Sequence, residues 1–357
     1  MKLLILGLVF ITPALWAQER YENFTGIRQL GMGGAAVATV NDETALLSNP
    51  AGLAKLRTYI ITLFDPEISA NSGMQSTLGG RSAADLMGPQ GLLTALAQNA
   101  DKHYHARAQV FPSFVVPNFG FGLFGNYSYD AEYVTAQPVN QKFRIDYVQD
   151  YAFVLGYALR IWDGRIKIGA AARVLNRIEA HTYLDETSTN LDFGNFVSEG
   201  GAIAGDGGLI ITLPWALLPT LAATVHDIGR TTFNQGDGIS YKPGRKPADV
   251  PMTVDAAIGL FPIHGNRLRS SFTIEYRDVL TYSEETDHQR RLHVGLEINF
   301  ADFMFFRGGM NQRYWTAGGE LAIQKFQFQA ASYGEEIGTV ATPREDRRYL
   351  GKFSFRF

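Results

Sequence analysis

Alternation of apolar and polar residues at every second position runs through most of the chain and restricts the folds that it can adopt. Between Arg267 and Arg277, the apolar residues fall on one face of an extended strand and most charged residues on the other. Residues 291–300 and 325–332 repeat the pattern. Lipid-facing Arg or Lys near a bilayer midplane costs roughly 2–4 kcal/mol, so a membrane barrel would turn Phe, Leu, Ile and Tyr outward. The strands of a soluble β-sandwich also alternate, so alternation alone does not distinguish a membrane barrel from a sandwich.

The lengths of the connections separate these two architectures. We predict about fourteen strands, at 56–64, 106–116, 119–133, 142–160, 165–181, 201–213, 219–228, 251–262, 267–279, 290–300, 303–311, 314–323, 325–334 and 346–357. Short and long connections alternate between them nearly throughout. Short periplasmic turns and long outer loops are typical of bacterial outer-membrane barrels, which have an even strand number. The sequence therefore predicts an all-β fold, a transmembrane antiparallel β-barrel in the bacterial outer membrane.

The last strand carries an aromatic face. Tyr349, Phe353, Phe355 and Phe357 alternate with Arg348, Lys352 and Arg356. A terminal Phe behind alternating aromatics resembles the signal read by the barrel-assembly machinery, which we expect as a partner during biogenesis; an ordinary edge strand is the alternative. A barrel must close in hydrocarbon, so this strand should pair with the first.

The first residues have the pattern of a secretory signal peptide. Lys2 precedes an apolar run at 3–11, and small residues lead to Ala17, after which we expect cleavage. A retained anchor is the weaker alternative because the apolar run is short. Domain boundaries follow: a signal peptide at 1–17, a segment at 18–55, and the barrel at 56–357.

Residues 26–56 are rich in Gly and Ala and precede nearly every predicted strand. Gly31, Gly33 and Gly34 allow tight turns and close backbone approach. Asn49-Pro50 ends any helix there, and the Asn49 amide can both donate and accept. About fourteen strands enclose a lumen wider than side chains alone fill. We therefore predict an N-terminal plug, or hatch, inside the lumen. A periplasmic tail beneath an open pore is the alternative.

This segment resembles the hatch of the FadL-type family of outer-membrane transporters, and PorV-like outer-membrane proteins carry a similar stretch. The matching residues are Leu30–Ala35, Asp42 and Asn49–Leu53, so the resemblance implies plug roles for Gly31, Gly33, Gly34, Asn49, Pro50, Ala51 and Gly52. It also implies transport of hydrophobic small molecules such as long-chain fatty acids, with hatch movement and sideways exit into the membrane. That mechanism needs an apolar lumen patch, for which alternation favours Phe261, Phe303 and Phe305. A non-transporting PorV-like scaffold or shuttle for secreted proteins is the alternative function.

Other functions lack support in the sequence. The formal net charge of −3 argues against a nucleic-acid partner, and no G-x-S-x-G nucleophile motif appears. We expect no enzyme, no cofactor and no metal. His103 and His105 would share a strand face, but no third ligand is indicated. Asp185-Glu186, Glu284-Glu285 and Asp287 are interpreted as solvated loop charge, with weak calcium binding as the alternative.

Two further predictions concern local structure. His226 and Asp227 would point to opposite faces of a regular strand and so could not act together. Residues 82–100 have leucines near helical spacing, broken at Gly88-Pro89, which predicts two short helices outside the barrel. These helices would pack on the barrel rim or collect an apolar ligand.

Overall fold

The computed structural model describes residues 22, 24–74, 102–133, 143–184, 196–234, 239–241, 244–283 and 285–357. The predicted signal peptide, the predicted helices at 82–100, Asp185-Glu186 and Glu284 lie outside these residues. The helical elements are α1 (Ile27–Gly31), α2 (Ala45–Ser48) and the 3-10 helix η1 (Pro50–Lys55). The strands are β1 (Ile60–Phe64), β2 (Glu67–Asn71), β3 (His103–Val110), β4 (Ser113–Val116), β5 (Phe119–Tyr133), β6 (Phe143–Ile161), β7 (Ile166–Leu184), β8 (Ser198–Thr212), β9 (Thr220–His226), β10 (Thr253–Leu260), β11 (Leu268–Tyr276), β12 (Leu292–Phe300), β13 (Met304–Asn311), β14 (Tyr314–Ile323), β15 (Phe326–Glu336) and β16 (Glu345–Arg356).

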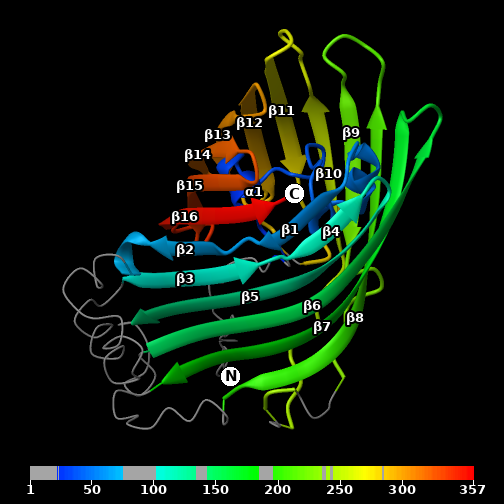
Figure 1. Ribbon diagram of the computed structural model, residues 1–357. Helices are drawn as coiled ribbons and strands as arrows, with labels where there is room; N and C mark the ends of the chain where they lie inside the picture. Colours follow the sequence, from blue (N-terminus) through cyan, green and yellow to red (C-terminus); the bar gives the residue numbers. More distant parts are fainter. Residues whose placement is uncertain are drawn as a thin grey trace, which may run out of the picture.

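The strands form one closed antiparallel barrel (Figure 1). β16 pairs with both β1 and β2, and β5 pairs with both β3 and β4, so each of these short pairs makes one barrel strand. The barrel therefore has fourteen strands, which confirms the predicted all-β fold. The last strand closes the barrel on the first, as predicted from the need to pair every edge.

The first two barrel strands are interrupted in mid-wall. The β1–β4 ladder stops at Thr62–Ser113, and pairing resumes between β2 and β3 at Glu67–Gln109. Pro66 and Pro112 lie in this gap and have no N–H to donate. Strand β1 ends at Phe64, as predicted for the first strand. The barrel strand nevertheless resumes as β2 and reaches Asn71, in a range that was predicted to be a connection.

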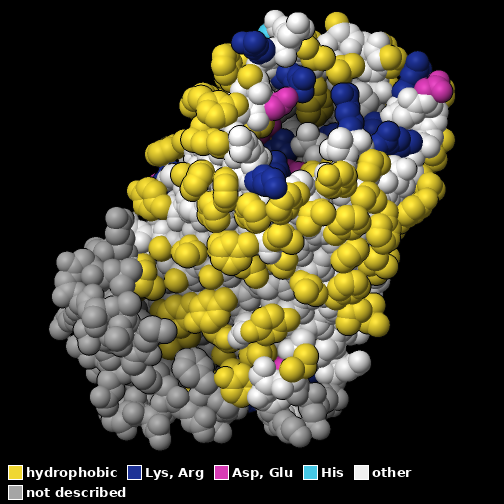
Figure 2. All heavy atoms as spheres, in the orientation of Figure 1, with side chains coloured by type: hydrophobic (Ala, Val, Ile, Leu, Met, Phe, Trp, Pro, Cys, Tyr) yellow, Lys and Arg dark blue, Asp and Glu magenta, His cyan; other side chains and the backbone are white. Residues whose placement is uncertain are grey.

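The two faces of the barrel differ as alternation predicts. On β11, Ile274 is 43% exposed and its neighbour Glu275 is 1% exposed. Figure 2 shows hydrophobic side chains over the outward faces of the strands. A fourteen-stranded barrel with this apolar outer face lies in the bacterial outer membrane.

None of the helices in the described residues is long and apolar enough to cross a membrane.

Antiparallel pairing leaves only short connections at one end of the barrel, which we call the short-turn end (Figure 1). The other end, the long-loop end, carries the longer connections and the two-residue turn between β13 and β14. Several tight turns hold non-glycine residues in the left-handed region, with φ of 74° at Asn118 and 56° at Ala301. These turns fix the register of the strands that they join.

Candidate functional site

Residues 24–56, which we call the lumen segment, lie inside the barrel and contact opposite walls. α1 packs against β13, β14, β15 and β16, whereas η1 packs against β5, β6, β7 and β8 (Figure 1). Most of the side chains between Ile27 and Leu56 are buried, and Met32, Ala45 and Leu53 have no exposed surface.

One wall holds the segment at a glycine pair. Gly169 on β7 and Gly208 on β8 are direct cross-strand partners. A methyl group at Gly169 would collide with the backbone of Pro50 and Ala51, and one at Gly208 would collide with the Asn49 side chain. Only glycine lets the lumen segment approach the wall this closely.

Asn49 is fully buried and uses both ends of its amide, as the sequence suggested. Its Nδ2 donates to the Val37 carbonyl at 2.9 Å and to the Ala223 carbonyl on β9 at 3.5 Å. Its Oδ1 accepts the Ala51 N–H at 3.1 Å. Gly52 packs against Val40 and Ala45 of the segment itself. Asn49 therefore links two parts of the segment to the barrel wall.

The opposite wall holds the Gly31–Gly34 turn. Gly33 and Gly34 have φ of 69° and 85°. The Thr316 hydroxyl accepts the Gly33 N–H at 2.9 Å and donates to the Gly31 carbonyl at 3.1 Å. Arg277 donates to the Gly34 carbonyl. The turn is therefore bonded to β14 and to the end of β11.

Further wall side chains satisfy the irregular backbone of the segment. Glu275 accepts the N–H groups of both Ala36 and Val37 at 2.8 Å, and Glu67 accepts that of Ile27 at 3.0 Å. Buried backbone groups without regular structure need such partners. Glutamates that face the lumen therefore pair backbone N–H groups of the segment.

A chain of ion pairs joins the segment to β12 and β13. Arg28 pairs with Asp42 at 2.7 Å and with Glu297 at 2.8 Å, and Arg307 pairs with Glu297 at 2.7 Å. Burial alone would raise the pKa of Asp42, but the Arg28 guanidinium and the Thr44 hydroxyl lower it to about 2. Asp42 is therefore ionised at neutral pH, and the Arg28 pair is intact.

An inner cavity of about 270 Å³ lies between the segment and this wall, toward the short-turn end. Its lining is mostly polar and includes Arg28, Glu297, Gln327 and Lys352. Of the three phenylalanines predicted to form an apolar lumen patch, Phe305 lines this cavity.

The other two predicted phenylalanines lie elsewhere. Phe261 lies beside the segment, with Lys55 Nζ 5.4 Å from its ring. Phe303 is 42% exposed and lines neither of the two cavities described here. The structure does not bring the three side chains together, and their roles in ligand binding stay predictions.

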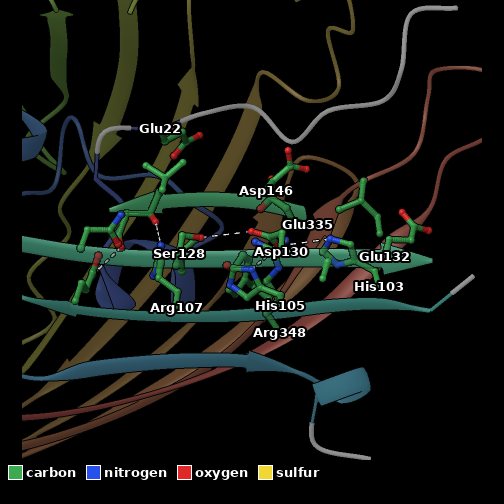
Figure 3. A pocket seen from close by; sticks show the side chains of 18 of the residues that line it. Glu22, His103, His105, Arg107, Ser128, Asp130, Glu132, Asp146, Glu335 and Arg348 are labelled. Atoms are coloured by element: carbon green, nitrogen blue, oxygen red, sulfur yellow. Dashed lines mark hydrogen bonds and ion pairs between the residues drawn. The ribbon is translucent and has the colours of Figure 1, made fainter. Parts of the chain in front are cut away.

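An outer cavity of about 160 Å³ lies on the other side of α1, toward the long-loop end. Figure 3 shows His103, His105, Asp130 and Arg348 pointing toward one another from β3, β5 and β16. His105 Nδ1 lies 2.7 Å from Asp130 Oδ1. His103 lies 3.1 Å from Asp346, which also pairs with Arg348 at 2.7 Å.

The floor of the outer cavity combines charged and apolar groups. Arg107 pairs with Glu67 at 3.0 Å, while Phe24 and Leu30 of the lumen segment supply apolar surface. The described residues contain no group of three or more His, Cys, Asp or Glu arranged to hold a metal ion.

An apolar patch adjoins this floor, and we call Phe24, Phe111 and Phe124 the phenylalanine cluster. Ring centroids lie 5.8 Å apart for Phe24–Phe124 and 6.2 Å apart for Phe111–Phe124. Sequence reasoning missed these residues. Alternation in residues 119–124 was a usable signal, because Phe119 and Phe121 face outward and Phe124 therefore faces inward.

The phenylalanine cluster lies on the lumen side of the wall interruption. Phe111 connects the cluster to the interruption: its ring packs in the cluster, and Asp65 Oδ1 accepts its backbone N–H at 2.6 Å. Asp65 also pairs with Lys352 at 2.9 Å. One buried carboxylate therefore bridges the interrupted strands where the backbone ladder is missing.

His226 and Asp227 differ from the expectation for a regular strand. Asp227 has φ of 54° and directly follows β9, which ends at His226. Both residues consequently approach Asp206: His226 Nδ1 at 3.4 Å, and the Asp227 backbone N–H at 3.0 Å. Arg173 bonds both Asp206 and Asp227 at 3.0 Å, which makes this a wall network.

The predicted assembly residues form the outward aromatic face of β16. Tyr349 is 50% and Phe357 43% exposed, and Phe353 and Phe355 stack with aromatic rings of β15. Phe357 exchanges two backbone hydrogen bonds of 2.9 Å with Ile61. Their role as an assembly signal stays a prediction.

No protein-family model matches the sequence. No curated protein matches it either. Solved structures of outer-membrane channels do match. The toluene transporter TodX of Pseudomonas putida has 12% identity and a TM-score of 0.55, with 93% of this chain and 98% of that chain covered. The CymD monoaromatic hydrocarbon channel has 9% identity and a TM-score of 0.55, with 93% and 96% covered.

The toluene transporter TbuX of Ralstonia pickettii has 13% identity and a TM-score of 0.53, with 93% of this chain and 98% of that chain covered. Identities this low show the fold alone. That fold is the FadL-type outer-membrane barrel, which confirms the architecture implied by the resemblance of the N-terminal segment.

Proposed function

We propose that this protein carries hydrophobic small molecules with an acidic head group, such as long-chain fatty acids, across the outer membrane. One observation carries the proposal: a lumen segment fills the barrel between a charged outer cavity and an apolar cluster beside an interrupted wall. We propose a transport protein rather than an enzyme. Fold neighbours described as toluene and monoaromatic hydrocarbon channels support a hydrophobic cargo.

The charged outer cavity supports an amphiphile over a bare hydrocarbon. A hydrocarbon placed against Arg107, Asp130 and Arg348 would cover charged groups without offering hydrogen bonds, which is unfavourable. A carboxylate accepts hydrogen bonds from guanidinium and imidazole groups. Its chain would lie on Phe24 and reach the phenylalanine cluster.

The wall interruption supports a sideways exit. A barrel wall in hydrocarbon is held by its backbone ladder, and here the ladder is replaced by the Asp65 carboxylate between Thr62–Ser113 and Glu67–Gln109. Opening this part of the wall breaks no ladder bond between those two pairs, and it lies against the phenylalanine cluster. The lumen segment blocks the lumen at rest and must shift to let a ligand pass.

Uptake into proteoliposomes tests the proposal. Purified protein should speed uptake of a long-chain fatty acid well above the protein-free rate, and more than it speeds uptake of toluene. Phe124→Ser should lower fatty-acid uptake severalfold, because it removes apolar surface from the path. Phe305→Ser, a matched change in the inner cavity, tests the ligand-binding role predicted for Phe305 from the sequence, and it should have the smaller effect.

The outcomes separate this proposal from its alternative. Equal uptake with and without protein contradicts transport and favours the PorV-like scaffold or shuttle, for which a pull-down from outer membranes should recover secreted proteins. A large effect of Phe305→Ser with none of Phe124→Ser would place the ligand path on the opposite wall.

A further inference from the structure

Three neighbouring connections at the short-turn end expose large apolar side chains. They join β6 to β7, β8 to β9 and β10 to β11. Their exposed fractions are 64% at Trp162, 66% at Trp215, 52% at Leu217, 36% at Leu218 and 67% at Ile263. We call these five residues the apolar turn patch. Exposed apolar surface of this kind marks a site of contact with a protein or a membrane.

The apolar turn patch is held in place by hydrogen bonds between the turns. The Arg165 carbonyl accepts the Thr212 N–H at 2.8 Å, and the Leu217 carbonyl accepts the Phe261 N–H at 2.7 Å. Leu217 and Leu218 have φ of 67° and 46°, in the left-handed region that residues with a side chain rarely adopt. The turn therefore presents its leucines outward at a cost in backbone strain.

The patch continues the lipid-facing surface of the barrel. Next to it, on the outward faces of the adjoining strands, are Ile161, Leu221 and Ile258, which are 46%, 48% and 57% exposed. Apolar surface thus runs unbroken from the membrane-spanning strands onto the turns. Figure 2 shows hydrophobic and basic side chains side by side at this end of the molecule.

The charge of the same sector is basic. Residues 160–167, 213–220 and 261–269 contain five basic residues (Arg160, Arg165, Lys167, Arg267 and Arg269) and one acidic residue, Asp163. The adjoining β12–β13 turn adds a second acidic residue, Asp302, which lies 3.8 Å from Arg269, so basic residues still outnumber acidic ones here. Apolar and basic surface therefore coincide in one sector of the rim.

We propose that the apolar turn patch inserts into the inner-leaflet interface of the outer membrane, where Arg267 and Arg269 bind anionic phospholipid head groups. Tryptophan favours the membrane–water interface, and basic residues beside apolar surface add attraction to anionic lipids. The sector from β6 to β11 consequently lies deeper in the inner leaflet than the sector from β12 to β16. The proposal is independent of transport.

Tryptophan fluorescence tests the insertion. The chain has four tryptophans, one of them in the predicted signal peptide, so Trp162→Phe with Trp315→Phe leaves Trp215 as the reporter in the mature protein. Reconstituted in phospholipids brominated near the head group, Trp215 emission should fall to roughly half of its value in unbrominated lipid, and it should be shielded from iodide. A variant in which Trp315, near the long-loop end, is the sole tryptophan of the mature protein serves as the reference for reconstitution.

A second comparison tests the head-group contact. In mixed bilayers, brominated phosphatidylglycerol should quench Trp215 more than brominated phosphatidylcholine does, and Arg267→Gln with Arg269→Gln should remove the difference. Leu217→Asn with Leu218→Gly relieves the backbone strain, so the barrel should still fold, but quenching should weaken. Quenching of Trp215 by iodide without quenching by bromolipid means that the turns lie in water, available to a periplasmic protein, and overturns the proposal. Equal quenching by both lipids overturns the head-group part.

Discussion

Single glycines decide how closely the lumen segment fits its wall. Gly208→Ala should loosen the segment, because the new methyl group collides with the Asn49 side chain and overpacking costs about 1–3 kcal/mol. We expect more frequent channel openings in planar bilayers. Gly205→Ala on the same strand is the control, since its methyl group meets nothing closer than 4.0 Å. Equal effects of the two changes would contradict this role of Gly208.

Lys55 should make docking of the segment depend on pH. Burial, followed by the nearby charge of Arg28, lowers its pKa from 10.5 to about 7. Undocking would restore the higher value, so between about pH 7 and 10.5 the undocked state binds more protons and docking strengthens as pH rises, by up to about 1 kcal/mol per pH unit. Below about pH 7 this dependence ends.

Channel recordings can check the Lys55 prediction. Openings should be more frequent at pH 6 than at pH 9, and Lys55→Met should remove the difference because it cannot be protonated. A pH dependence that survives in Lys55→Met would assign it to another group.

At the scale of elements, the interrupted strands depend on one carboxylate. Asp65→Ala leaves the Phe111 N–H without its acceptor and Lys352 without its 2.9 Å partner. We expect the folded barrel to lose about 1–3 kcal/mol, seen as a lower temperature for loss of the fast-migrating band on gels. Thr58→Ala, an exposed change just before β1, should not shift that temperature. An unchanged temperature for Asp65→Ala would show that the gap needs no bridge.

The contacts of the terminal strand β16 lead to a further prediction, about assembly. Deleting Phe357 removes its two hydrogen bonds to Ile61 and the end of the predicted assembly signal. The folded fraction in outer membranes should fall. Substituting Phe357→Ala keeps the backbone bonds, so a fall in both variants assigns the effect to the aromatic ring, and no fall in either contradicts the assembly role.

Strands could be predicted from the sequence where lipid and lumen impose opposite polarity on alternate residues, as at Ile274 and Glu275. The predicted connection after residue 64 was wrong for residues 67–71, because the Asp65 side chain bridges the interrupted strands through the Phe111 N–H, and alternation does not reveal such a contact. The outer cavity could not be predicted either. His103, Asp130 and Asp346 meet only after the barrel closes, and no local spacing relates them.

At the scale of the whole molecule, the resemblance and the structure point to partly different residues. Asn49-Pro50 and the Gly31–Gly34 turn were chosen by resemblance, and the structure gives each a wall partner. The phenylalanine cluster could not be chosen that way, because Phe24, Phe111 and Phe124 come from three separate stretches of chain. The lumen segment was therefore predicted from the sequence, whereas the proposed ligand path along these side chains rests on the structure.

Movement of the lumen segment is the central claim, and a disulfide lock tests it most directly. Gly31 and Gly318 face each other, with a Cβ on either lying 3.4 or 3.1 Å from the Cα of the other, so two cysteines there are close enough to bond once the backbones separate slightly. The chain has no cysteine of its own. We predict that Gly31→Cys with Gly318→Cys loses fatty-acid uptake when oxidised and regains it on reduction, while Gly31→Cys alone is insensitive to both. Full uptake through a barrel whose cross-link is verified by mass would contradict the account.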